Sequence, residues 1–573
     1  MRIVVARNLG FCMGVKRALE TVLEQKSRTH RRIITYGPLI HNPQVVELLK
    51  FRGIDSSRDL SAFQNSALGF ISAHGVSPEV RSKLNQVGKV FDASCPDVLK
   101  VQGKVKKQAF KGYSTVILGD RGHSEVEGLL GFTGGRGHVV ASVEEVEKLP
   151  PMDKVCLVSQ TTQNQEEFEE IARALKARYP EALVFPTICS STLTRQEELK
   201  RVARQVQAMV VVGGKNSANT ARLARLARGL GLDVFLIETA AEVDCAALAN
   251  FAAVGVAAGA STPEWVIQEV VDRLYACICR RNPVKRILWA SAAFLLQSKL
   301  YLALGAAALT YASSVFLGVI PLAGPALFSF FIILEISACE RLSGYYSLLG
   351  LPKLISPTSR RRTALWTVVV LVASLGTFFS LAFVGLPLIG VAGAFLPLLA
   401  LAAGGRYSPL RSALYKVVGV IPAIRETSAA LLGALAVVLV PLFAAAEKPG
   451  LNRAASVAAF VSILFFNRCV LAAVPRLQKD RLRGLRTFPT FLGVRGAEFS
   501  VFGLNILGPA IVVAGWGGEG PGAGYPLMLT VWTFLFLLRM LLQRDRVSSA
   551  VIFHLLLDGQ FIFSGLLGLM AMR

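Results

Sequence analysis

Three cysteines in loop-like settings give this sequence its clearest opportunity for metal chemistry. They stand in Gly10-Phe11-Cys12-Met13-Gly14, Ala93-Ser94-Cys95-Pro96 and Thr187-Ile188-Cys189-Ser190-Ser191, 83 and 94 residues apart. Those separations each match one small α/β unit. Three thiolates from three units can hold an iron–sulfur cluster and leave one iron open to a substrate oxygen. Ordinary buried thiols fit the same spacing, so the cysteines alone leave both interpretations open.

Polar residues that suit a phosphorylated ligand lie between and after these cysteines. Three of the six histidines occupy polar, glycine-rich segments, and Glu125 follows the third of them. Hydroxyls, amides and loop N–H groups of this kind suit a diphosphate, which needs many donors. The candidates are His41, His74, His123, Thr161, Ser217, Asn219 and Ser261.

Short β-branched runs alternate with helical stretches through residues 1–280. Examples are Ile3-Val4-Val5, Thr115-Val116-Ile117-Leu118 and Met209-Val210-Val211-Val212. Strands alternating with helices predict an α/β domain with largely parallel sheets. Several runs end in Gly or His followed by polar residues, which is where such folds place their sites.

Residues 281–573 have a different chemistry. Of the net charge of +24, +17 lies here, as 26 Lys and Arg against 9 Asp and Glu. Apolar runs of about 18 or more residues indicate transmembrane helices. Nine such runs predict an all-α polytopic membrane domain, near 300–318, 319–337, 364–384, 386–403, 427–446, 455–474, 499–516, 526–543 and 549–571.

Basic connections alternate with nearly neutral ones between these runs. They lie near 353–362, 406–425, 476–495 and 539–546. The positive-inside rule places them, and the first domain, in the cytoplasm, in a multi-pass protein of the inner (cytoplasmic) membrane with its C-terminus outside. Topology and anionic lipid explain the charge, so no nucleic-acid partner is expected. The start, Met1 to Val5, does not read as a signal peptide.

A cytoplasmic location also makes disulfides unexpected. Cys156, Cys245, Cys277 and Cys279 lie on strand or helical stretches outside the three cysteine motifs. We interpret them as packing residues.

Over residues 1–275 the sequence resembles the 4-hydroxy-3-methylbut-2-enyl diphosphate reductase (LytB/IspH) family. The resemblance rests on ordered motifs: Gly-Phe-Cys-x-Gly-Val, His-Asn-x-x-Val-Val, Ser-Ala-His-Gly-Val-Ser-Pro, Asp-Ala-x-Cys-Pro, Gly-His-x-Glu-Val-Glu-Gly, Gln-Thr-Thr, Thr-Ile-Cys and Asn-Ser-x-Asn-Thr. It implies three α/β units in a trefoil-like arrangement. It also implies the last step of the methylerythritol phosphate route, in which the substrate loses its hydroxyl as water to give isopentenyl and dimethylallyl diphosphate.

The resemblance carries residue roles as well. It implies that Cys12, Cys95 and Cys189 ligate one 4Fe-4S cluster, that Glu125 donates the proton, and that a reduced ferredoxin or flavodoxin-type protein supplies electrons. It implies further that Thr161 positions the hydroxyl, that His123 lies close to the substrate, and that the diphosphate is held by His41, His74, Ser217, Asn219 and Ser261. One departure is Ala218, where the family usually has a serine.

The second half resembles the UbiA prenyltransferase superfamily, in which two aspartate-rich motifs bind a prenyl diphosphate through magnesium. The match is the segment from Asp480 to Gly493, which contains Gly-Leu-Arg-Thr-Phe-Pro. The acidic residues of these two motifs are mostly missing. At the positions of the second motif the chain has Ala473, Arg476 and Asp480, and at the place of the first motif it has the segment from Glu335 to Arg341. Magnesium is usually bound through several carboxylate or phosphate oxygens, so it is not expected in the membrane half.

Three interpretations of the membrane half stay open: a metal-free lipid or prenyl-diphosphate binder, an anchor, or an altered transferase. For the whole chain we favour a membrane-tethered iron–sulfur reductase. The alternative is a membrane prenyl-diphosphate-binding or transfer protein with a regulatory reductase-like domain.

Overall fold

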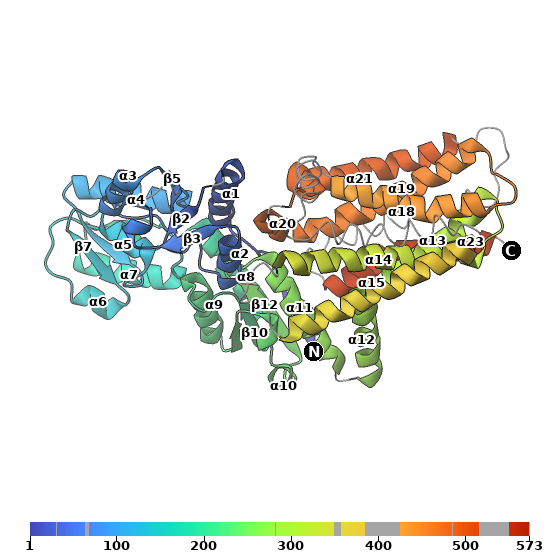
Figure 1. Cartoon of the computed structure of the whole chain (residues 1–573). Helices are drawn as coiled ribbons and strands as arrows, with labels where there is room; N and C mark the ends of the chain where they lie inside the picture. The colour runs from blue at the N-terminus through green and yellow to red at the C-terminus, as the bar shows by residue number, and fades with distance from the viewer. Residues whose placement is uncertain are drawn as a thin grey trace. The chain divides into compact units, whose positions relative to one another are not determined.

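The computed structural model describes residues 1–29, 31–63, 68–280, 282–348, 357–383, 424–483, 485–514 and 549–571. The chain forms two compact units (Figure 1). One comprises Met1–Ile278 with Arg481–Gly484, and the other Cys279–Asp480 with Leu485–Arg573.

The first unit contains three four-stranded sheets in which every pairing is parallel. The first sheet has the order β1 (Arg2–Val5), β12 (Ala253–Ala258), β10 (Ala208–Val212), β11 (Asp233–Ile237). The second is β3 (Ile54–Ser57), β2 (Ile33–Tyr36), β4 (Leu68–Ile71), β5 (Val90–Asp92). The third is β7 (Gly137–Val140), β6 (Ser114–Leu118), β8 (Val155–Ser159), β9 (Leu183–Val184). The predicted α/β fold with parallel sheets is confirmed.

Helices connect the strands, as parallel pairing requires. They are α1 (Met13–Arg28), α2 (Pro43–Phe51), α3 (Pro78–Val87), α4 (Pro96–Phe110), α5 (Ser124–Leu130), α6 (Val143–Glu147), α7 (Gln165–Arg178), α8 (Ser190–Ala203), α9 (Ala218–Gly229), α10 (Cys245–Leu248) and α11 (Glu264–Arg280). Proline in the first turn and Asn or Ser caps start several of them, for example α2 behind Asn42 and α3 behind Ser77. Each sheet has its own apolar core, such as Val116, Leu157 and Leu175 in the third.

All the described secondary structure of the second unit is helical. Its helices are α12 (Pro283–Gln297), α13 (Leu300–Leu317), α14 (Ala323–Leu348), α15 (Pro357–Phe383), α18 (Ile424–Ala444), α19 (Leu451–Ala473), α20 (Leu477–Arg483), α21 (Phe488–Ala514) and α23 (Ala550–Ala571). Four helical segments are long and apolar enough to cross a membrane: Leu300–Leu317, Ala364–Ala382, Leu451–Arg483 and Ala550–Met570.

These four segments coincide with predicted apolar runs, and three further runs overlap α14, α18 and α21. The runs predicted near 386–403 and 526–543 lie outside the described residues, as do most of the basic connections near 406–425 and 539–546. The several apolar helices are confirmed, and the number nine stays a prediction. The sequence did not predict α12.

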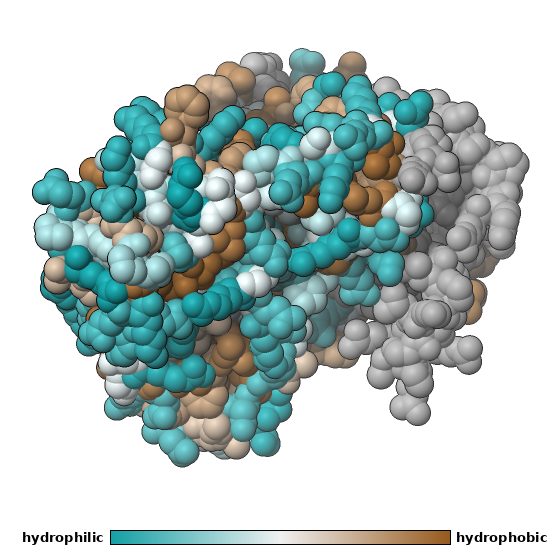
Figure 2. All heavy atoms as spheres, turned by 90° about the vertical axis from the view of Figure 1, so that its left-hand side faces the viewer, coloured by the Kyte–Doolittle hydropathy of each residue, from teal (hydrophilic) through white to brown (hydrophobic). Residues whose placement is uncertain are grey.

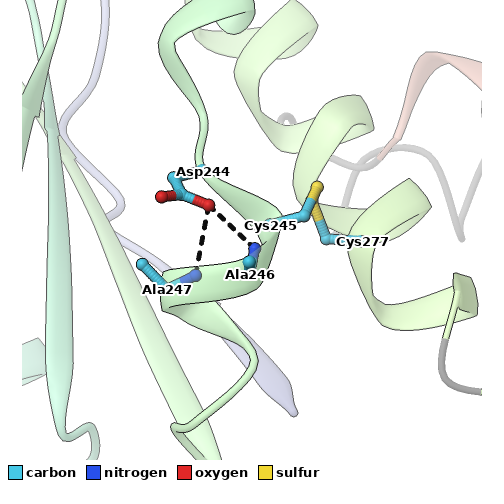
Figure 3. Close-up of a disulfide and its surroundings, with 5 residues drawn as sticks. All are labelled: Asp244, Cys245, Ala246, Ala247 and Cys277. Carbon is cyan, nitrogen blue, oxygen red and sulfur yellow. Dashed lines mark hydrogen bonds between the residues drawn. A yellow bond between two sulfur atoms is a disulfide. The ribbon is translucent and has the colours of Figure 1, made fainter.

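One expectation about the cysteines is wrong. Cys245 and Cys277 form a disulfide that joins α10 to α11, rather than packing as free thiols (Figure 3). The bond becomes possible because the fold brings their Cα atoms to 5.2 Å across 32 residues of sequence. Asp244 caps α10 beside it, accepting from Ala246 N at 2.9 Å and Ala247 N at 3.1 Å. Cys156 and Cys279 are free thiols.

Candidate active site

Each of the three predicted cluster cysteines is the N-cap of a helix. Cys12 precedes α1 after β1, Cys95 precedes α4 after β5, and Cys189 precedes α8 after β9. The three preceding strands belong to three different sheets, so each α/β unit contributes one thiol. A helix N-terminus favours the thiolate form that binds metal. At Cys12 this is visible as a contact of 3.4 Å from Val15 N to Sγ.

The thiols lie close enough to act on one another. A Cβ placed on Gly14 would be 2.5 Å from Cys95 Sγ and 3.9 Å from Cys12 Sγ, so residue 14 must lack a side chain. Burial raises the pKa of Cys95 and Cys189, and the negative charge of Cys12 raises both further. All three are free. A bound metal favours the thiolate form of half-buried thiols such as Cys95 and Cys189, and an iron–sulfur cluster is one such group.

Arg195 is a buried cation beside these thiols that the sequence analysis missed. Its side chain is 8% exposed and lies within electrostatic range of Cys12 and Cys189. It donates to Gly10 O and to Ser191 Oγ, both at 2.5 Å. It therefore joins α8 to the loop before Cys12. The only sequence signal is its place six residues after Cys189, inside a helix.

Glu125 is held as a buried acid in the first turn of α5. Thr161 N donates to Oε1 at 2.7 Å and Thr161 Oγ1 donates to Oε2 at 3.0 Å. Burial raises the pKa of Glu125 to about 7, although the two Thr161 bonds and Arg222 act in the opposite direction. The carboxyl also lies within electrostatic range of Cys189. The structure thus brings together the predicted acid, a predicted cluster cysteine and Thr161, whose predicted role was to position the substrate hydroxyl.

The three predicted histidines form one cluster. Their ring centroids lie 4.4 Å (His41–His74), 5.7 Å (His41–His123) and 5.5 Å (His74–His123) apart. Burial lowers the pKa of all three, to about 4 for His123 and well below the usual value for His74. They are therefore neutral near pH 7. His123 Nδ1 accepts from Glu125 N at 3.2 Å, which leaves its proton on Nε2.

The loop before α9 and the segment after β12 approach this histidine cluster. Ser261 Oγ donates to His41 O at 3.0 Å, and a Cβ on Gly214 would be 3.0 Å from the same carbonyl. Ser217 caps α9, and Asn219 is 5% exposed within its first turn. Among the described residues, His74 Nε2 and Asn219 Nδ2 are buried without a hydrogen-bond partner. The Asn219 amide N–H calls for an acceptor such as a phosphate oxygen, and His74 calls for one as well in its Nε2–H tautomer.

A second buried arginine, also missed from sequence, joins α9 to the acid. Arg222 is 3% exposed, and its Nη2 lies 2.7 Å from Asp120 Oδ2. It donates to Gln163 Oε1 at 2.8 Å and to Thr162 Oγ1 at 3.1 Å. Asp120 lies five residues before Glu125 in the chain, and Thr162 and Gln163 directly follow Thr161. Arg222 thereby ties the diphosphate candidates on α9 to the loops that position the acid.

In the second unit, one residue at the expected aspartate-rich positions, Glu335, has both carboxylate oxygens engaged by internal hydrogen bonds. Both Glu335 oxygens accept from α15, from Ser374 Oγ at 2.6 Å and from Thr377 Oγ1 at 3.1 Å. Asp480 is 5% exposed. The side chains of Glu340 and Arg341 lie outside the described residues. A buried ion pair links Arg468 Nε to Asp558 Oδ1 at 2.9 Å.

Three α/β units that each contribute one free thiol, with a buried acid beside one of these thiols, define a three-unit α/β protein with a candidate metal site. The model of the LytB protein family matches residues 3–275. A 4-hydroxy-3-methylbut-2-enyl diphosphate reductase from Opitutus terrae is 43% identical over 288 residues, which cover 48% of this chain and 100% of that protein. A reductase of the same name from Pelobacter propionicus is 44% identical over 275 residues, covering 48% of this chain and 98% of that protein. Through its first half, the chain belongs to this reductase family.

A solved structure is also similar to this chain. A UbiA homologue from Aeropyrum pernix K1 aligns with 16% identity and a TM-score of 0.35, covering 48% of this chain and 99% of that chain. The family membership that the comparisons establish is that of the first half.

Proposed function

We propose that residues 1–280 catalyse the reductive dehydroxylation of 4-hydroxy-3-methylbut-2-enyl diphosphate to isopentenyl and dimethylallyl diphosphate. The observation that carries this proposal is the juxtaposition of a buried acid, Glu125, with three helix-capping thiols. Overall, the substrate takes up two electrons and two protons and releases water. The intact thiols and acid argue against an inert regulatory remnant, which would tolerate their loss.

Cys12, Cys95 and Cys189 would hold a 4Fe-4S cluster. When bound, the cluster supplies single electrons and one iron without a protein ligand. The fit of these residues to the cluster rests on three observations: their N-cap positions, the absence of a side chain at Gly14 and their free thiols. A reduced ferredoxin or flavodoxin-type protein would supply the electrons.

Glu125 would protonate the departing hydroxyl. A general acid works best with a pKa near the operating pH, and the pKa of about 7 meets that condition. Thr161 holds the Glu125 carboxyl through two hydrogen bonds, one of which places the Thr161 hydroxyl directly beside that carboxyl. The charge of a bound diphosphate would raise the pKa of Glu125 further and keep it protonated.

The diphosphate would be held by neutral donors. These are His41 and His74, Ser217 and Asn219 at the start of α9, and Ser261, with His123 directed by Glu125 N toward the substrate. The N–H groups at the start of α9 add the attraction of a helix N-terminus for anions. The buried donors of His74 and Asn219 would gain their missing acceptors.

For the second unit we propose a membrane domain of the inner membrane, with the reductase in the cytoplasm and the C-terminus outside. Support comes from four helical segments apolar enough to span a bilayer and from the excess of basic residues. The engaged oxygens of Glu335 support a role without magnesium.

The chain purified without oxygen and supplied with iron and sulfide tests the reductase proposal. We expect a cluster absorption spectrum and oxidation of a reduced viologen dye that depends on 4-hydroxy-3-methylbut-2-enyl diphosphate. A protein that binds the cluster but never oxidises the dye with substrate would refute the proposal.

A further inference from the structure

Helix α12 (Pro283–Gln297) has no role in the proposed function. Asn282 caps it, accepting from Lys285 N at 3.1 Å. None of its 15 residues is buried. Four large apolar side chains are strongly exposed: Val284 (63%), Ile287 (61%), Leu288 (64%) and Phe294 (63%).

These four side chains share one side of the helix. Positions 284, 287, 288 and 294 recur at the spacing of an α-helical face. Arg286, Trp289 and Ala293 fall on the opposite side, where Trp289 and Ala293 are half-buried. An exposed apolar stripe of this size usually marks a surface that is covered by another molecule and not by water.

The neighbours of α12 indicate what that cover is. It contacts α13 and α23, which contain two of the four candidate membrane spans. Only Ser298 and Lys299 separate it from α13, and Lys299 turns the chain with a φ of 65°. Figure 1 shows α12 lying crosswise to the long helices α14, α15 and α19 of the same unit. Its 15 residues reach about 22 Å, too short for a bilayer core of about 30 Å.

The positive charge around α12 indicates that the molecules covering its apolar stripe are anionic. Residues 280–299 contain five Lys and Arg and no Asp or Glu. Trp289 lies in the middle of the helix, and tryptophan is enriched at the membrane–water boundary. Basic residues flanking an apolar helical stripe are typical of helices that lie in the headgroup region of anionic bilayers.

We propose that α12 is an in-plane membrane helix whose Val284–Ile287–Leu288–Phe294 face is covered by anionic phospholipid. It would fix the orientation of the membrane unit at the cytoplasmic surface, directly after the reductase unit ends. The inference rests on the proposed membrane location of the second unit.

Lipid photo-crosslinking on the full chain tests the inference. A diazirine-bearing leucine analogue replaces Ile287, Ala293 or Leu371 in three separate proteins. Each is reconstituted in vesicles of equal phosphatidylethanolamine and phosphatidylglycerol, and adducts are identified by mass. Leu371, 51% exposed within the span Ala364–Ala382, reports on the membrane location alone. Ala293 is the control on the other side of α12.

We expect lipid adducts at Ile287 and Leu371, with Ile287 giving about fivefold more than Ala293, and an excess of phosphatidylglycerol among the adducts at Ile287. Lys285→Glu combined with Arg286→Glu should remove that excess. Adducts at Ile287 that are mainly protein, or equal at Ile287 and Ala293, overturn the inference while Leu371 still supports the membrane domain. Absence of lipid adducts at Leu371 overturns both.

Discussion

The two units distribute polar and apolar groups in opposite ways. The first shows a mainly hydrophilic face (Figure 2), and only five of its described large apolar side chains are exposed, against 29 in the second. Inside the first unit the buried polar groups converge on Glu125 and three thiols. Inside the second, Arg468 pairs with Asp558 and Glu335 accepts from two hydroxyls, while both amide atoms of Gln560 are buried without a partner. Buried polar atoms without a partner thus occur in both units, and in the first unit Asn219 Nδ2, at the candidate diphosphate site, is one of them.

Among the substitutions considered, removal of the Glu125 carboxyl should have the largest effect, and this effect should be on the activity of the first unit. Glu125→Gln keeps the shape but cannot donate the proton, so we expect kcat to fall by about 10²–10⁴-fold with the cluster retained. Glu127→Gln, on the same helix and exposed, is the control and should be near wild type. Steady-state dye oxidation measures both. Wild-type turnover by Glu125→Gln would assign the proton to another group.

In the second unit, the buried ion pair between Arg468 and Asp558 should have its effect on stability. Arg468→Met leaves Asp558 buried without its partner, which should destabilise the second unit by about 3–5 kcal/mol. The double variant Arg468→Met, Asp558→Leu removes both charges and should recover most of the loss. Thermal unfolding in lipid nanodiscs, followed by helical circular dichroism, measures this. Equal destabilisation in the single and double variants would show that the pair is not what matters there.

A single methyl group tests the convergence of the thiols. In Gly14→Ala the new Cβ would meet Cys95 Sγ at 2.5 Å, so iron and sulfide content should fall by roughly 10-fold or more. Gly103→Ala in α4, where nothing lies within 4 Å of the new Cβ, is the control. Full cluster content in Gly14→Ala would mean that Cys95 and Cys12 do not share a metal.

The pH dependence sharpens the assignment of Glu125. Its pKa of about 7 in the free protein means that it carries the proton below pH 7 and loses it above. We expect kcat/KM to fall about tenfold per pH unit on the alkaline side of pH 7, while kcat holds to higher pH because bound diphosphate raises the pKa. Glu125→Asp should move that limb. Activity that is flat from pH 6 to 9, in kcat/KM and in the variant alike, would exclude a carboxyl of this kind as the acid.

The smallest expected effect concerns Ala218, where the family usually has a serine. Ala218→Ser adds a hydroxyl donor at the start of α9 and should lower KM by about tenfold or less, with kcat unchanged. Ala221→Ser, one turn further along α9, is the comparison. An unchanged or raised KM would mean that position 218 does not face the diphosphate.

The sequence predicted what is local and failed where tertiary contacts decide. Alternating strands and helices indicated the parallel sheets, and the motif residues indicated the thiols, Glu125 and the histidines. Arg195 and Arg222 escaped notice because an arginine inside a helix carries no pattern that reveals its burial. Cys245 and Cys277 were misread because their pairing depends on how α10 meets α11 and on an assumption about compartment. Helix α12 was missed because Lys285 and Arg286 interrupt a run already too short to span a bilayer.

The most direct measurement is the electron count per product formed by the full chain without oxygen. We predict that two electrons from the reduced dye yield one molecule of isopentenyl or dimethylallyl diphosphate, identified by mass spectrometry. Dye oxidation without either product, or no oxidation in a chain whose cluster is fully assembled, would contradict it.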